Sequence, residues 1–224
     1  MRKILFCIII LLTALNSLTL SAQNTELKAG LRAGHNTVFG GFAAMSVEAI
    51  QTVLDNFSVG GGLQYNTIGR TALEARPAYH MTFDWGKLSP EILLEYTNLS
   101  SINSFVAGVG ASLDFESISA RLGYYYRLYG GKGGSISEPF NIYYEFRAHF
   151  LRKLEKWILD LVITNCEIFE LERHYQPSYI AEACFNPTSR MGISFGIGCK
   201  PSGTFHLSVD NYQSYIKTGV CYRW

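Results

Sequence analysis

Apolar residues recur at every second position through most of the chain after residue 22. In residues 26–34, leucine and alanine alternate with glycine and charged residues, and residues 117–129 and 139–150 repeat the alternation with bulkier side chains. This spacing places the apolar side chains on one face of a β-strand, because successive strand residues point to opposite faces. No segment keeps the 3.6-residue period of a helix for three turns. The sequence therefore predicts an all-β fold.

Two all-β architectures fit this alternation, and they differ in which face points inward. A soluble sandwich buries its apolar face, whereas an outer-membrane barrel turns that face to lipid and its polar face to the lumen. The segments run about 10 to 15 residues, longer than the roughly 5 to 6 of an average globular strand. Their polar face is rich in glycine, as at Gly60, Gly62, Gly108 and Gly110, and aromatic residues such as Trp157 gather near segment ends. We predict a closed antiparallel transmembrane β-barrel, with a secreted sandwich as the alternative.

The first 22 residues have the pattern of a secretory signal peptide. Arg2 and Lys3 supply a positive start, residues 4–20 are almost wholly apolar, and Ala22 offers a small residue for cleavage. A membrane anchor is the alternative, but the apolar stretch is short and the small residues follow it directly. The expected organisation is a signal peptide over residues 1–22 and an outer-membrane barrel domain over residues 23–224, exported through the periplasm.

The charge balance excludes one class of partner. Only 17% of the residues are charged, against about 25% in typical soluble domains. Removal of Arg2 and Lys3 takes the formal net charge from +1 to −1. A nucleic-acid-binding protein would carry a basic excess, so we expect no nucleic-acid partner.

The number of strands follows from the alternating segments and their connections. Thirteen segments can be distinguished, but a barrel of this kind needs an even number. Tight connections are expected at residues 55–56, 86–88, 116–117, 155–156 and 187–189, and connections that are longer or richer in glycine at 130–135 and 173–177. If residues 201–211 form the last outer loop, the final strand covers about 212–224. We predict twelve strands, with ten or fourteen as alternatives.

The C-terminal segment carries a more specific pattern. Apolar and polar residues alternate over residues 216–224, which include Tyr222 and end in Trp224. In this the sequence resembles Gram-negative outer-membrane barrels, whose last strand is read by the barrel-assembly machinery. Residues 30–36 and 219–224 also resemble the small PorT-like outer-membrane barrels. The resemblance implies the fold and an outer-membrane location, and it implies no shared catalytic set and no cofactor.

The polar face should place a nearly balanced set of charges in the lumen. The basic members are Lys28, Arg32, Arg76, Arg121, Arg127, Arg147, Lys217 and Arg223, and the acidic ones are Glu48, Glu74, Glu91, Glu95, Glu145, Asp160 and Glu182. A selective pore tends to carry rings of one sign. We therefore expect a paired network and a small or absent conductance.

The alternation places the side chains of Cys166 and Cys184 on the lumenal face. If a hairpin is centred on Tyr175, Cys166 and Cys184 lie opposite each other. They are then either two small apolar fillers or a disulfide, which the periplasm would permit. No cysteine or histidine spacing resembles a zinc site, so no metal is expected.

One constellation suggests catalysis. His206 and Ser208 share a strand face, and Asp210 is the only acidic residue near them. A His–Ser pair can act as base and nucleophile if a third group orients the histidine, and the pair resembles that of outer-membrane lipid A deacylases. The alternative is a polar loop segment. The expected role is therefore structural, that of a small pore, or that of a subunit in a secretion or surface complex, with a lipid-modifying hydrolase as the competing class.

Overall fold

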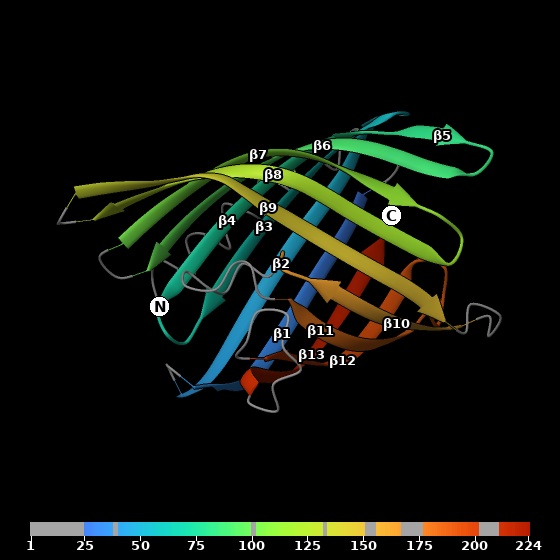
Figure 1. Ribbon diagram of the computed structural model, residues 1–224. Helices are drawn as coiled ribbons and strands as arrows, with labels where there is room; N and C mark the ends of the chain where they lie inside the picture. Colours follow the sequence, from blue (N-terminus) through green and yellow to red (C-terminus); the bar gives the residue numbers. More distant parts are fainter. Residues whose placement is uncertain are drawn as a thin grey trace.

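The computed structural model describes residues 25–37, 40–99, 102–131, 134–150, 156–166, 177–201 and 211–224. These residues form strands and their connections, wound into the barrel of Figure 1. Within these ranges no helix is long and apolar enough to cross a membrane. The strands are β1 Thr25–Asn36, β2 Gly40–Leu54, β3 Phe57–Asn66, β4 Arg70–Tyr79, β5 Met81–Phe83, β6 Gly86–Leu99, β7 Ile102–Asp114, β8 Ile118–Gly131, β9 Gly134–Phe150, β10 Trp157–Thr164, β11 Ser178–Phe185, β12 Met191–Pro201 and β13 Asn211–Arg223.

All neighbouring strands pair antiparallel, and the sheet closes on itself. The first strand pairs with the last, from Glu26 beside Arg223 to Asn36 beside Gln213. The ring is completed by β4, which pairs with both β3 and β6. Because β5 continues β4 along the same edge of β6, the barrel has twelve strands. The predicted fold and strand number are confirmed.

The interruption between β4 and β5 lies at His80. Its backbone N–H donates to the Asn56 carbonyl at 2.7 Å. Its ring lies between two serines, with Nε2 2.7 Å from Ser58 Oγ and Nδ1 2.9 Å from Ser89 Oγ. The thirteenth labelled strand therefore results from this local break; the extra segment of the sequence pattern, expected to begin near residue 204, lies outside the described residues.

The two ends of the barrel differ in their connections. We call the end where β1 begins and β13 finishes the turn end; there the Trp224 N–H donates to the Thr25 carbonyl at 3.0 Å. Tight turns follow β2, β5 and β7 at this end. The opposite end, the loop end, holds the two longest intervals between strands, after Thr164 and after Pro201.

Two expected connections are wrong. Residues 86–88 lie inside β6, because the turn comes earlier, at Asp84 and Trp85. Residues 130–135 do not all form a connection, because β8 continues to Gly131 and β9 begins at Gly134. The glycines there lengthen a hairpin at the loop end instead of ending its strands.

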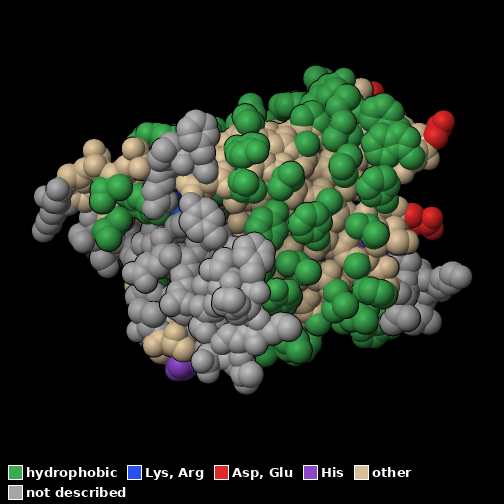
Figure 2. All heavy atoms as spheres, in the orientation of Figure 1, with side chains coloured by type: hydrophobic (Ala, Val, Ile, Leu, Met, Phe, Trp, Pro, Cys, Tyr) green, Lys and Arg blue, Asp and Glu red, His purple; other side chains and the backbone are tan. Residues whose placement is uncertain are grey.

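The outer surface of the barrel is apolar. Large hydrophobic side chains point outward on strand after strand, for example Leu122 at 56% and Ile197 at 56% exposed. Figure 2 shows such side chains spread over the visible wall, with acidic side chains at its edge. Aromatic pairs lie near the turn end, where Trp157 contacts Phe185 with ring centroids 4.8 Å apart. An apolar wall with aromatic residues near its rim is typical of a transmembrane barrel.

Glycines on the inward face make room for large side chains that lie across the wall. Tyr143 of β9 stands beside Gly123 of β8, which stands beside Gly110 of β7. A Cβ atom at either glycine would overlap the Tyr143 ring. Tyr215 of β13 covers Gly198 of β12 in the same way. The glycine-rich polar face predicted by the sequence thus serves inward packing.

The interior also contains two apolar clusters. The first joins Phe42, Val162, Ile180 and Tyr215, with Ile68 packed against it. The second consists of Leu93, Val106, Tyr125 and Tyr143, with Cys166 packed against it. The lumen is therefore lined by apolar as well as charged side chains.

Candidate functional site

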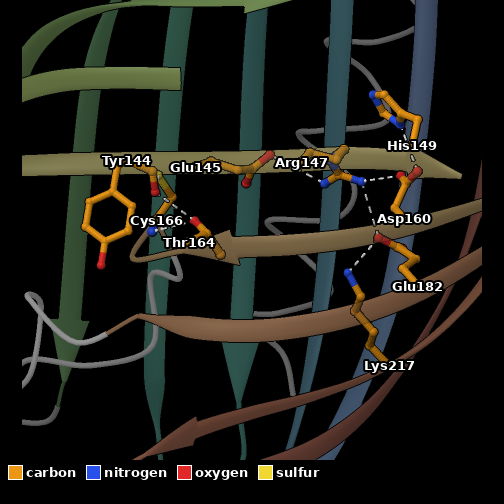
Figure 3. A network of polar contacts seen from close by, with 9 residues as sticks. All are labelled: Tyr144, Glu145, Arg147, His149, Asp160, Thr164, Cys166, Glu182 and Lys217. Carbon is orange, nitrogen blue, oxygen red and sulfur yellow. Dashed lines mark hydrogen bonds and ion pairs between the residues drawn. The ribbon is translucent and has the colours of Figure 1, made fainter. Parts of the chain in front are cut away.

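The most connected group of charges in the lumen surrounds Arg147 of β9. Its guanidinium Nη1 lies 2.8 Å from Asp160 Oδ2 and 3.5 Å from Glu182 Oε2, and its Nη2 lies 3.4 Å from Glu145 Oε1. The ammonium of Lys217 lies 2.9 Å from Glu182 Oε2. Figure 3 shows these side chains meeting inside the wall. Two cations thus hold three carboxylates.

The strand register explains why these residues meet. Asp160 of β10 stands between His149 of β9 and Glu182 of β11, and His149 Nδ1 lies 2.8 Å from Asp160 Oδ1. Lys217 of β13 reaches Glu182 across β12 because the intervening residue is Gly196, where a Cβ would lie 2.9 Å from Lys217 Cε. One glycine therefore links the network to the barrel's closing strand.

A second group lies on the β4–β8 side of the barrel. Arg121 Nε donates to Glu91 Oε1, and the Tyr143 hydroxyl donates to the same oxygen at 3.0 Å. Arg76 pairs with Glu74 on β4. The Glu91 carboxylate is thereby held from both β8 and β9.

Three further ion pairs lie toward the two ends of the barrel. Near the loop end, Arg70 Nη2 lies 3.8 Å from Glu95 Oε1, and both side chains are almost fully buried. At the turn end, Glu26 binds Lys28 and Arg223, each at 3.0 Å. Charge pairing thus extends along the lumen.

The predicted inward charges are mostly brought together in pairs. Arg32 lies over the Tyr215 ring at 4.4 Å, and Arg127 lies over the Tyr125 ring at 5.2 Å. Of the predicted acidic residues, Glu48 alone has no ion pair within the described ranges. The prediction omitted Glu26, Arg70 and His149, although their positions in the alternation assign all three to the inward face.

The expected juxtaposition of Cys166 and Cys184 is wrong. Cys184 stands beside Ile158 in the β10–β11 ladder, which ends with Thr164 beside Ser178. Cys166 instead follows β10, where its thiol donates to the Tyr144 carbonyl at 3.2 Å and its N–H to Thr164 Oγ1 at 2.9 Å. Both cysteines are free thiols in this structure.

The suggested catalytic residues His206, Ser208 and Asp210 lie outside the described residues, so their arrangement stays a prediction. An unchanged lipid A mass profile in cells carrying Ser208→Ala would exclude that activity. Within the described ranges, no group of three or more histidine, cysteine or acidic residues could hold a metal ion.

The geometry defines a class: a twelve-stranded antiparallel transmembrane barrel with a charge-paired lumen. No protein-family model and no curated protein sequence matches the chain. Solved outer-membrane barrels do match its fold. The KdgM porin is 12% identical with a TM-score of 0.55, covering 89% of this chain and 99% of its own. The NanC porin is 11% identical with a TM-score of 0.58, covering 89% and 100%.

A barrel of another kind is similar to the same degree. The translocator domain of the autotransporter NalP from Neisseria meningitidis is 11% identical with a TM-score of 0.55, covering 91% of this chain and 89% of its own. At these identities the likeness shows the fold alone. The neighbours share an architecture, and their functions differ.

Proposed function

We propose that this chain is an integral outer-membrane protein, exported through the periplasm, with a porin-like barrel and a narrow, charge-paired lumen. The apolar wall fits lipid, and an outer-membrane barrel keeps its chain ends and tight turns on the periplasmic side. The turn end then faces the periplasm, and the loop end faces the cell exterior. The KdgM and NanC porins support a porin-like role through their shared architecture.

The pairing of lumenal charges carries this proposal. Arg147, Lys217 and their carboxylate partners are fixed to one another on neighbouring strands, so neither sign dominates that part of the wall. A strongly ion-selective pore would present rings of one charge to the passing ion. The arrangement therefore favours a small-pore, structural or complex-subunit role over that of a large general channel.

Planar-bilayer recording tests the proposal. The purified protein should give small or absent currents, because paired side chains occupy the lumen. Fractionation of cells should place the protein in the outer membrane, where it should resist extraction by alkaline buffer. Large, stable open channels would overturn the narrow lumen, and recovery in another fraction would overturn the location.

The proposed partners are outer-membrane lipid and, during biogenesis, the barrel-assembly machinery. The segment ending in Tyr222 and Trp224 supports the second, since it resembles the last strand of outer-membrane barrels. A secretion or surface complex is a further partner to test, in keeping with the resemblance of residues 30–36 and 219–224 to PorT-like barrels. Co-purification in mild detergent would identify such a complex.

A further inference from the structure

The inward-facing side chains are more deeply buried in the loop-end half of the barrel than in the turn-end half. In the loop-end half, each of the twelve strands contributes an inward-facing residue that is no more than 7% exposed. We call this set the buried ring: Asn36, Ala44, Asn66, Arg70, Thr97, Ser104, Arg127, Asn141, Thr164, Ser178, Lys200 and Gln213.

Opposite walls are buried alike at this level. Strands β7 and β13 lie six positions apart in the closed order of twelve strands, so they face each other across the lumen. Ser104 on β7 is 2% exposed, and Gln213 on β13 is 3% exposed. A wall residue of a water-filled pore keeps water on its lumenal side. Burial around the whole circumference therefore leaves little of the described wall open to water at this level.

The turn-end half is more open. The side chains of Lys28 and Arg223 are 44% and 49% exposed, and that of Arg147 is 27% exposed. Some side chains of the turn-end half are nevertheless buried on the side formed by β3 to β6. Ser58 and Ser89 are examples, and both contact His80. The open part of the lumen thus lies along β9, β13 and β1.

An apolar cluster strengthens the closure of the loop-end half. Phe42, Val162, Ile180 and Tyr215 come from β2, β10, β11 and β13, and Ile68 packs against them from the β3–β4 turn. Apolar constrictions exclude water, and some channels close by this means. Ion passage through such a layer is unfavourable because an ion would lose its hydration.

We propose that the buried ring and this apolar cluster form the permeation barrier of the barrel, while the turn-end half is a water-filled vestibule. The proposal rests on the proposed function for its orientation, which makes the vestibule open to the periplasm. Solutes would then reach the charges around Arg147 from the periplasmic side and stop at the buried ring. Passage requires the loop-end half to rearrange.

Cysteine labelling of the barrel in lipid nanodiscs, which leave both ends open to water, tests the barrier. In a chain whose native mature cysteines are replaced by serine, Ser104→Cys is compared with Ser112→Cys, a half-buried position on the same face of β7. On the opposite wall, Gln213→Cys is compared with native Cys221 retained alone on β13. A water-soluble maleimide should modify the two ring positions at least about tenfold more slowly, because local opening must precede reaction.

The proposed barrier would be wrong if, in the folded barrel, the maleimide modified the two members of each pair at equal rates. Equal rates after denaturation are the control for intrinsic thiol reactivity, and circular dichroism confirms the fold of each variant. If one ring variant fails to fold, the pair on the opposite wall decides. Labelling does not depend on membrane location, so a failure of the proposed function is detected separately, by fractionation and bilayer recording.

Discussion

At the scale of single residues, the inward glycines decide where large side chains can lie. Tyr143 crosses Gly123 and Gly110 to reach Glu91 on β6, so one side chain spans four strands. The sequence predicted that glycine would be common on this face. It did not predict which aromatic side chain would use the space, because that depends on the side-chain rotamer and on the acceptor at its far end.

Substitution of Gly123 tests this packing. Gly123→Ala should lower the free energy of unfolding by about 1–3 kcal/mol, because the added methyl displaces Tyr143 and its hydrogen bond to Glu91 is lost. Denaturant titration of the reconstituted barrel measures the change. Gly130→Ala on the same strand is the control, since a Cβ there meets nothing within 4 Å. Equal losses in the two variants would contradict the packing.

At the scale of strands, the network around Arg147 joins three neighbours. Arg147→Gln should destabilise the barrel by about 3 kcal/mol, because it leaves the carboxylates of β9, β10 and β11 without their shared cation. Lys28→Gln is the control at an exposed pair, which should lose no more than about 1 kcal/mol. Unfolding in denaturant compares them. A larger loss in the Lys28 variant would contradict this account of the network.

The strands themselves were largely predictable, and their exact pairing was less so. The alternation of apolar and polar residues assigned the outward and inward faces of the strands. It could do so because the outer face of a transmembrane barrel meets lipid and the inner face meets the lumen. It did not determine the β10–β11 register, since thirteen residues separate Thr164 from Ser178 and a connection of that length is compatible with several alignments. It also missed the break at His80, which depends on Ser58 and Ser89 from neighbouring strands.

At the scale of the whole molecule, closure depends on the last strand meeting the first. Residues from Glu26 to Asn36 pair with β13 along its length, so the barrel cannot close until the C-terminal segment is in place. The ion pairs between Glu26 and Arg223 and between Lys217 and Glu182 add side-chain links on either side of this strand. The sequence indicated the closing segment but not these partners, which lie far from it along the chain.

The terminal aromatic residue gives a prediction at this scale. Trp224→Ala should reduce the amount of folded protein in the outer membrane severalfold, because the assembly machinery is proposed to recognise the end of β13. Trp157→Ala is the control, as another exposed tryptophan near the turn end. Immunoblotting of outer-membrane fractions measures both. Equal amounts of the two variants would contradict a recognition role for Trp224.

Because Tyr143 lies across two glycines, these three positions cannot change independently during evolution. A larger residue at position 110 or 123 is compatible with this wall only if Tyr143 is replaced by a smaller residue or turned away. Related chains should therefore change these three positions together, although 33 residues separate the first from the last. Coordinated substitution at these positions would identify related proteins even where the rest of the barrel sequence has diverged.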